Sequence, residues 1–438
     1  MWLFMHSNNG ELRRTSVTAT AFSGLALLVS VASAQPQKTN QPAPPNPPAK
    51  QGPQGQAGQP TQPGPPGQPP PPVRPPFGLP YAGLTGDQLT AFNNGLDEFE
   101  EVATVQDGLG PIFNGKSCAA CHSVPAVGGS SNILVTRFGH STGASFDPLI
   151  SLGGSLLQDK AINPIGMEHV PPQANVTAFR QSTALFGLGL IEAIPDATIL
   201  AGVRSTPRDG ILGRAAMVVD PASGKTLVGR FGWKAQEATL LGFAGDAYLN
   251  EIGITNRLFP TENAPNGNLA LLKKLDTVPD PEDVVDKSTG KAGIDRLADY
   301  MRMISPPPAA PINASTAFGA KIFLDVGCAN CHTPMMMAGP SPISAISNQN
   351  VMLFSDLLLH DMGSLGDGIA QGAAGVREMK TPPLWGVGVS APYLHDGRAN
   401  DLNTAIRAHD GEAKATRDRY INLQPDQQQL LIQFLNSI

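Results

Sequence analysis

The chain has 438 residues, of which 41% are hydrophobic and 15% charged, and its formal net charge is −6. This length suits two or three domains once non-globular segments are removed. The charge is mildly acidic, and no block of Lys or Arg could follow a phosphate backbone, which argues against a nucleic-acid partner.

Residues 1–34 have the parts of a secretory signal peptide. Arg13 and Arg14 precede an apolar stretch over residues 19–31, and Ala32-Ser-Ala34 forms a small-residue cleavage pattern. The stretch is shorter than the ~20 residues that a membrane-spanning helix needs, although an uncleaved signal anchor is the alternative. We therefore predict export to the periplasm, cleavage after Ala34 and no integral membrane segment in the mature chain.

Residues 35–80 consist almost entirely of Pro, Gln, Gly, Ala and Asn. Such a composition has too little apolar surface to offset the entropy lost on ordering the chain, so we predict a disordered linker. Its proline content favours extended polyproline II segments and a semi-stiff spacer, with an inert tail as the alternative.

Two segments share the pattern Cys-x-x-Cys-His, Cys118-Ala-Ala-Cys-His122 and Cys328-Ala-Asn-Cys-His332. On a helical turn, positions i, i+3 and i+4 share one face, so both thiols reach one porphyrin edge and the histidine lies under the iron. Two disulfides do not require a histidine after each pair, and zinc ribbons separate their pairs by roughly 15–20 residues. We predict two covalently bound haem c groups on Cys118, Cys121, Cys328 and Cys331, with His122 and His332 as proximal iron ligands.

The two motifs lie in a repeated sequence. Residues 112–122 align without gaps with residues 322–332, and residues 182–190 align with residues 381–389. Two matching blocks in the same order indicate a tandem duplication.

Helical periodicity recurs through the body of the chain, in residues 85–102, 236–253, 293–303, 403–409 and 426–436. The helix at 293–303 is expected to end before three consecutive prolines, which mark a domain boundary. We predict a mainly α fold of two tandem cytochrome c-like haem domains with long Gly/Pro-rich loops, an N-terminal domain at 81–305 and a C-terminal domain at 306–438.

The body of the chain, from residue 79 to 438, resembles the bacterial di-haem oxidoreductases, also called thiol oxidoreductases, which are relatives of the di-haem cytochrome c peroxidases. The matching segments are residues 108–113, 117–122, 185–194, 229–235, 355–363, 380–385 and 391–398. The resemblance implies a periplasmic two-domain protein with one haem in each domain and electron transfer between them. Its partner would be a redox protein or a small oxidant, and a calcium ion between the domains is a further implication.

The resemblance also indicates a distal ligand for the second haem. His409 stands fourteen residues after His395, the spacing at which the peroxidases carry a distal methionine. Ligation by two histidines would lower the potential, because methionine ligation raises it. The alternatives are that His409 is a surface residue and that His360, Met362 or Met379 is the ligand.

Four further side chains have predicted roles, three in this half and Trp233 in the first half. His395 and Arg398 are expected to bind haem propionates. Trp233 and Trp385 are either core residues or aromatic groups between the haems, with core packing as the default.

The first haem has fewer candidate ligands. His140, eighteen residues after His122, is a candidate distal ligand, with a surface-loop position as the alternative. Peroxide cleavage needs an acid/base group, and Glu192 is the candidate catalytic residue, with a structural role as the alternative. The segment around Glu192 departs from the peroxidase pattern, which puts peroxidase activity in doubt.

Two functions follow from these features. The first is an exported di-haem c-type cytochrome oxidoreductase, with peroxidase-like chemistry at the N-terminal haem. The alternative is a non-catalytic periplasmic electron carrier. Thiol chemistry has no support, because all four cysteines belong to the two haem motifs.

Overall fold

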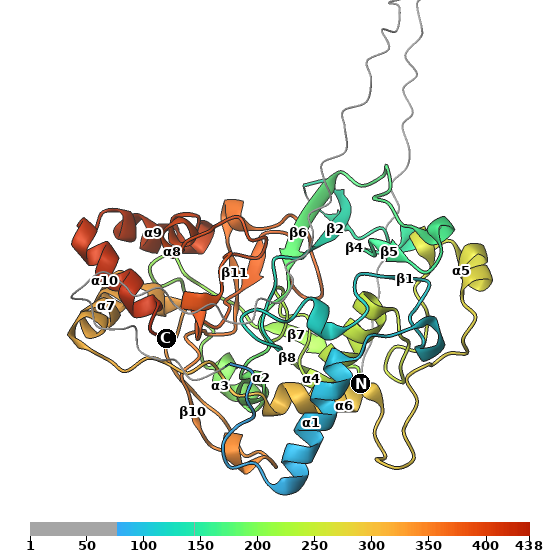
Figure 1. Ribbon diagram of the computed structural model, residues 1–438. Coiled ribbons are helices and arrows are strands. Elements are labelled where there is room, and N and C mark those ends of the chain that lie inside the picture. Colours follow the sequence, from blue (N-terminus) through green and yellow to red (C-terminus); the bar gives the residue numbers. More distant parts are fainter. Residues whose placement is uncertain (1–76, 144) are drawn as a thin grey trace, which may run out of the picture. The chain divides into compact units, whose positions relative to one another are not determined.

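This computed structural model describes residues 77–143 and 145–438. Two pairs of packed helices organise these residues. Helix α1 (Gly86–Glu100) packs against α6 (Gly293–Met303), and α7 (Ala314–Asp325) packs against α10 (Pro425–Leu435) (Figure 1). The predicted signal peptide and the predicted linker up to residue 76 lie outside the described residues.

Local sequence explains where these helices begin. Thr85 and Gln88 form a capping box at the start of α1, in which the Thr85 hydroxyl accepts from the Gln88 amide at 3.2 Å. Asn313 and Thr316 do the same for α7, at 3.0 Å. Helix α10 begins with Pro425, whose missing N–H would have no partner in the first turn.

A glycine lies at each helix crossing. A Cβ on Gly95 of α1 would lie 2.3 Å from the Arg296 carbonyl oxygen of α6, and one on Gly319 of α7 would lie 2.2 Å from that of Leu430 in α10. Only glycine allows the two backbones to approach this closely. Aromatic rings continue the contact between α1 and α6, since the ring centroids of Phe99 and Tyr300 lie 4.9 Å apart.

Shorter helices fill the rest of both halves. They are α2 (Leu188–Glu192), α3 (Asp196–Leu200), α4 (Leu240–Ala247), α5 (Leu269–Leu275), α8 (Leu402–Arg407) and α9 (Lys414–Ile421). A π-helix, Tyr248–Ile252, continues α4. No helix in the described part of the chain is long and apolar enough to cross a membrane.

The strands form small sheets, and all of their pairings are antiparallel. In the largest sheet, β2 (Leu134–Ser141) pairs with β3 (Phe146–Asp147), β4 (Leu156–Leu157) and β6 (Val176–Gln181). The two-stranded sheets are β1 (Ile112–Phe113) with β5 (Lys160–Ala161), β7 (Ala216–Val219) with β8 (Thr226–Gly229), β9 (Met336–Met337) with β10 (Asn350–Val351), and β11 (Leu359–Asp361) with β12 (Glu378–Lys380).

The prediction of a mainly α fold is wrong. Helices of all types account for 34% of the described residues and strands for 15%, so loops and short sheets make up most of the structure. The strands escaped prediction because many are only two residues long, and the longest, β2, does not alternate buried and exposed positions. The predicted boundary between residues 305 and 306 stays a prediction.

The two repeated blocks differ in how closely their structures match. Gly187 and Gly386 occupy the same place in the second block, and both have a positive φ, at 74° and 69°, before a short helical turn. In the first block, Ile112 and Phe113 lie in strand β1, whereas Ile322 and Phe323 lie in helix α7. The gapless alignment of the first block therefore joins residues with different backbone structures.

Candidate haem sites

The second Cys-x-x-Cys-His segment borders a large cavity. Cys328–Asn330 form a 3-10 turn, and the His332 amide donates to the Cys328 carbonyl at 2.9 Å. Cys328, Cys331 and His332 line a cavity of about 310 Å³, together with His409 from the loop after α8. The residues of the second motif and the predicted distal histidine thus share one cavity.

The imidazoles of His332 and His409 have the same hydrogen-bonding arrangement. Nδ1–H of His332 donates to the Phe354 carbonyl at 3.0 Å, and Nδ1–H of His409 donates to the Ala405 carbonyl at 2.9 Å. A carbonyl oxygen only accepts, so each Nε2 keeps its lone pair, as iron coordination requires. Burial lowers the pKa of both rings, and the nearby charge of His409 contributes to lowering that of His332, to about 4. Both imidazoles are therefore neutral at physiological pH, the form that binds a metal.

Aromatic side chains line the same cavity. Trp233, Trp385 and His395 all contribute to its wall. Trp233 donates from Nε1 to the Gln181 carbonyl at 2.9 Å, and its ring meets His395 edge-on at 6.3 Å. The structure therefore places both tryptophans at the cavity rather than only in the core. The guanidinium of Arg398 pairs with Asp396 at 2.5 Å, and Arg398 is absent from the cavity lining.

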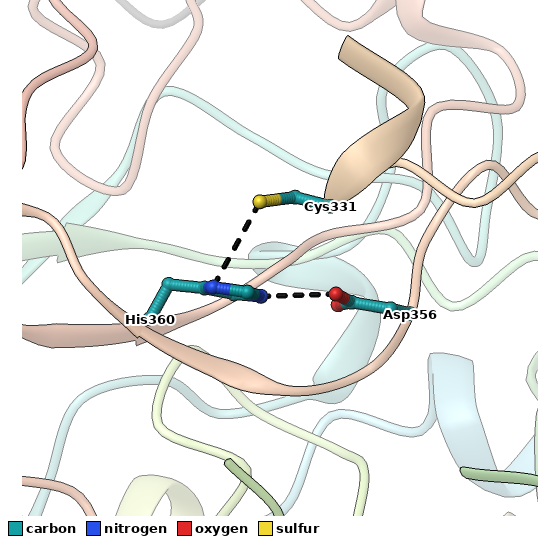
Figure 2. Close-up of side chains that lie close together, drawn as sticks. All are labelled: Cys331, Asp356 and His360. Carbon is teal, nitrogen blue, oxygen red and sulfur yellow. Dashed lines mark hydrogen bonds and ion pairs between the residues drawn. The ribbon is translucent and has the colours of Figure 1, made fainter. Parts of the chain in front are cut away.

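His360 is unsuited to bind iron in this arrangement. Its Nε2 lies 2.9 Å from Asp356, and the Cys331 sulfur lies 3.8 Å from its Nδ1 (Figure 2). The same Nδ1 lies 2.7 Å from Glu412. Burial alone would lower the pKa of His360, but hydrogen bonds to Asp356, Cys331 and Glu412 raise it to about 12. The ring is therefore an imidazolium with no free lone pair, which favours His409 over His360 as the ligand.

Cys331, Asp356 and His360 also form one of the groups that could hold a metal ion. Cys331 belongs to the Cys-x-x-Cys-His segment, where its sulfur would bond to the porphyrin. Asp356 and Glu412 already satisfy both ring nitrogens of His360. We therefore interpret this group as a set of contacts that holds the second motif in place, not as a metal site.

The first Cys-x-x-Cys-His segment has a different surrounding. Cys118–Ala120 form a 3-10 turn that the Ser117 hydroxyl caps, and Nδ1–H of His122 donates to the Gly129 carbonyl at 3.0 Å. Burial lowers the pKa of His122, and Phe99 of α1 meets its ring edge-on at 6.1 Å. None of the three motif residues lines the 310 Å³ cavity, although Val124 and Pro125 do.

A buried acid lies next to the first motif. Glu251 is in the π-helix, and its backbone carbonyl accepts from the Asn114 and Gly115 amides at 2.8 and 3.0 Å. The Asn114 side chain donates to Glu251 Oε2 at 2.8 Å. Burial raises the pKa of Glu251, and its charge, after burial, helps to raise that of the Cys121 thiol to about 11. Single-turn π-helices occur frequently at functional sites.

Glu251 was not among the residues predicted from the sequence. The available signal was an acidic residue in the apolar helical segment 236–253, at a position followed by Ile-Gly-Ile. Periodicity alone does not reveal that this residue approaches Cys121 from more than a hundred residues away.

Arg137 of β2 accompanies this acid. Its charge opposes the effect of burial on the pKa of Glu251 and of Asp246. Its Nε atom is buried and lacks a hydrogen-bond partner in the described residues. An unpartnered N–H beside a haem motif fits an anionic group such as a haem propionate.

The two remaining predicted residues of the first half lie in hydrogen-bonded positions. Both oxygens of Glu192 are engaged, because Oε1 accepts from the Leu240 amide at 2.7 Å and Oε2 from Arg302 at 2.6 Å. His140 lies near the end of β2, where Nδ1–H donates to the Gln173 carbonyl at 2.8 Å. The catalytic role of Glu192 and the ligand role of His140 stay predictions.

Two partly buried Cys-x-x-Cys-His segments, each with a histidine whose Nδ1–H donates to a backbone carbonyl, are the features of a di-haem protein. Residues 172–438 match the family described as "Di-haem oxidoreductase, putative peroxidase". The chain belongs to the di-haem oxidoreductase family, and the resemblance predicted from the sequence is confirmed. Membership of this family implies two haem groups.

Several solved structures are similar to this chain. Hydrazine synthase of Kuenenia stuttgartiensis is 16% identical over 88% of this chain and 100% of that chain, with a TM-score of 0.39. A MauG-like protein associated with microbial copper homeostasis is 14% identical over 84% and 93%, with a TM-score of 0.37. The diheme peroxidase BthA of Burkholderia thailandensis is 14% identical over 80% and 85%, with a TM-score of 0.37. No curated protein matches the chain.

Proposed function

We propose that this chain is an exported di-haem c-type cytochrome with oxidoreductase activity. Residues around the second motif hold an electron-transferring haem, and residues around the first hold the haem at which a small oxidant such as peroxide is reduced. The observation that carries this proposal is the difference between the two motifs. His409 shares a cavity with His332, whereas a buried acid, Glu251, lies beside Cys121.

Haem iron supplies one-electron redox chemistry, and binds a small oxidant where its sixth position is open. The neutral Nε2 atoms of His332 and His409 would be able to ligate the iron of a haem held by the second motif. A haem with two strong protein ligands mainly passes electrons. The second half therefore has the features of an electron-transfer site.

Glu251 is suited to hold and deliver a proton at the first haem. The Asn114 amide donates to Oε2, so a proton on the neutral acid is held at Oε1. Because burial raises the pKa of Glu251, this carboxyl keeps its proton to a higher pH than an exposed glutamate does. Positioned acids of this kind contribute typically 10²–10⁴-fold to proton-dependent reactions.

The cavity also reaches from the segment that follows the first motif to the second motif. Its lining includes Pro125, three residues after His122, and His332, with Trp233 and Trp385 in the same wall. Large aromatic rings between two haems would support electron transfer from one half to the other.

A calcium ion between the two halves is part of this proposal. Gln181 has a buried Oε1 atom without a hydrogen-bond partner, and its Nε2 donates to the Pro392 carbonyl at 2.9 Å. Amide oxygens are ligands that Ca²⁺ accepts, and the unpartnered Gln181 Oε1 is the atom that supports this part of the proposal.

Optical and electron paramagnetic resonance spectra of the haem-loaded protein test the proposal. We expect the half-reduced protein to have one low-spin haem and one high-spin or five-coordinate haem, and to consume peroxide. If both haems stay low-spin and ignore peroxide, the chain is a non-catalytic electron carrier. Mass spectrometry of the exported protein checks both cleavage after Ala34 and the two covalent haem attachments.

A further inference from the structure

A group of carboxylates outside both haem motifs lies in the loops that follow the π-helix. One oxygen atom from each of Glu262, Asp280 and Glu282 lies within 4.8 Å of the other two. None of the three residues lines the 310 Å³ cavity. Asp276 lies close enough for its charge to act on Glu262.

Glu262 is buried without a partner for its charge. Its relative exposure is 6%, and its Oε2 atom has no hydrogen-bond partner in the described residues. Its other oxygen accepts only from the Asn263 amide, at 3.2 Å. Across residues 77–143 and 145–438, no Lys, Arg or His nitrogen lies within ion-pair distance of Glu262, Asp280 or Glu282. A buried carboxylate without a counter-charge is costly, so a cation is the missing partner.

The carboxylates of this group repel one another. Burial, followed by the charges of Glu282, Asp280 and Asp276, raises the pKa of Glu262 to about 9. Burial also raises the pKa of Glu282, and the charge of Asp280 adds to this rise. Carboxylates that repel one another in this way are stabilised by a shared cation.

Thr255 holds two of the three carboxylates in place. It is fully buried, and its amide donates to Glu282 Oε2 at 2.8 Å. Its hydroxyl donates to the same oxygen, and lies 3.3 Å from Asp280 Oδ1. These contacts leave Glu282 Oε1 and Asp280 Oδ2 without a hydrogen bond among the described residues. Each carboxylate therefore keeps one oxygen for a further ligand.

The glycines of residues 108–111 allow the backbone to approach this group. A Cβ on Gly108, whose φ is 94°, would lie 2.4 Å from Cβ of Glu282. A Cβ on Gly110 would lie 2.9 Å from Glu262 Oε1. A small cavity of about 10 Å³ is lined by this loop, Asp276 and Glu282, whereas Glu262 and Asp280 lie outside its lining. The loop leads directly into β1 and then to Cys118.

We propose that Glu262, Asp280 and Glu282 bind a structural calcium ion. Carboxylate oxygens from flexible loops suit Ca²⁺, whereas Mg²⁺ demands strict octahedral geometry and retains several waters, which a nearly enclosed Glu262 does not accommodate. The ion joins residues 255–262 and 276–282 beneath the glycine loop, and thereby supports the segment that carries the first haem motif. It shares no residue with the Gln181–Pro392 position.

Calcium content and thermal stability of the haem-loaded protein test this site. After treatment with a chelator, wild-type protein is expected to unfold at a lower temperature, and added Ca²⁺ to raise Tm by about 5 °C. Glu262→Gln keeps the shape of the side chain and removes its charge, so this variant is expected to bind one calcium equivalent fewer and to lose most of the Tm response. Asp280→Asn, at the exposed edge of the group, is a second variant that does not disturb the interior. Glu101→Gln, an exposed acid outside the group, is the matched control.

The outcomes are distinct. Equal calcium content in wild type, Glu262→Gln and Asp280→Asn overturns the site, as does a wild-type Tm that ignores Ca²⁺. An equal Tm response to Mg²⁺ alone overturns the assignment of calcium. Loss of one equivalent in Gln181→Ala but not in Glu262→Gln assigns the bound ion to the other position and also overturns this site.

Discussion

Around the second motif, the chain passes from α7 almost directly into Cys328, whereas residues 101–117 separate α1 from Cys118. Both helices make the same glycine-mediated crossing, α1 with α6 and α7 with α10. The added segment of the first half contains β1 and the glycine loop over Glu282. The two halves therefore share a glycine-mediated helix crossing, whereas the loops that surround each haem motif differ.

The divergence determines which groups surround each motif. The second half presents the neutral imidazole of His409 to the cavity of His332. The first half presents Glu251, whose pKa is raised by burial, and Arg137, whose Nε atom is buried without a hydrogen-bond partner among the described residues. A second imidazole near the motif favours electron transfer in the second half. An acid near the motif favours proton-coupled chemistry in the first half.

Removal of the acid in the first half is expected to have the largest effect. Glu251→Gln keeps the hydrogen bond to Asn114 but cannot deliver a proton, so kcat for peroxide reduction should fall by roughly 10²–10⁴-fold. Stopped-flow measurement of peroxide reduction gives this value. Glu192→Gln is the rival variant, because the sequence favoured Glu192. If Glu192→Gln loses turnover and Glu251→Gln does not, our assignment of the acid is wrong.

The next largest effect is a loss of stability on removal of Asp367, whose ion pairs join the two halves. Asp367 is fully buried and accepts from Arg180 Nε at 2.7 Å, and it lies 2.9 Å from Lys234 Nζ. Asp367→Asn leaves two buried cations without their counter-charge, so the free energy of unfolding should drop by about 3–5 kcal/mol. Asp325→Asn, which breaks the exposed pair with Lys321, should cost at most ~1 kcal/mol. Chemical denaturation measures both changes.

The carboxylate of Asp367 also makes the stability of the fold depend on pH. Burial alone would raise the pKa of Asp367, but the charges of Arg180 and Lys234 outweigh it and lower the pKa. A lowered pKa in the folded state contributes stability above the ordinary carboxyl pKa of about 3.9, and this contribution is lost as the pH falls further. The difference between wild type and Asp367→Asn should therefore shrink below about pH 4. A difference that stays constant to pH 2 would contradict the ion-pair interpretation.

The next prediction concerns the second half. His409→Met exchanges an imidazole for a thioether, and methionine ligation raises the potential. We expect a rise on the order of 0.1 V in one of the two potentials, within the ~0.8 V range that axial ligands span. Redox titration followed by the optical spectrum gives the value.

His140→Ala is the matched variant in the first half. We expect its spectrum to equal that of wild type, because His140 is a partly exposed residue near the end of β2, in keeping with the surface-position alternative. A change of spin state in His140→Ala would make this residue a ligand, and the first haem would then resemble the second. An unchanged potential in His409→Met would remove the distal role of His409.

Sequence was sufficient for features that depend on neighbours along the chain. Each Cys-x-x-Cys-His segment is recognised from residues at most four positions apart. Helix α6 lies at residues 293–303, as its periodicity and the following prolines predicted. The segment 236–253 was predicted as one helix, but α4 begins only at Leu240 and the chain continues as a π-helix. The side chains of Thr239 and Glu192 accept hydrogen bonds from backbone amides in the first turn of α4, which explains why the helix starts at Leu240.

Features that depend on distant parts of the chain could not be predicted. Glu251 approaches Cys121 only because Asn114 and Gly115 hydrogen-bond to its backbone. Glu262 is buried beside Asp280 and Glu282 by loops without periodicity. In both cases the chemistry comes from tertiary contacts, whereas local propensity describes only short segments.

The smallest predicted effect tests what the two halves share. Gly95→Ala and Gly319→Ala each force a Cβ against a backbone carbonyl at 2.3 and 2.2 Å, so the helices must separate. Overpacking of this kind costs about 1–3 kcal/mol, and we expect the two variants to cost similar amounts. Gly86→Ala, with open space around its Cβ, is the control and should be neutral. Thermal unfolding measures all three. If only one crossing glycine proves sensitive, the halves differ in their helix packing as well as in their loops, and the duplication has diverged further than the shared crossing indicates.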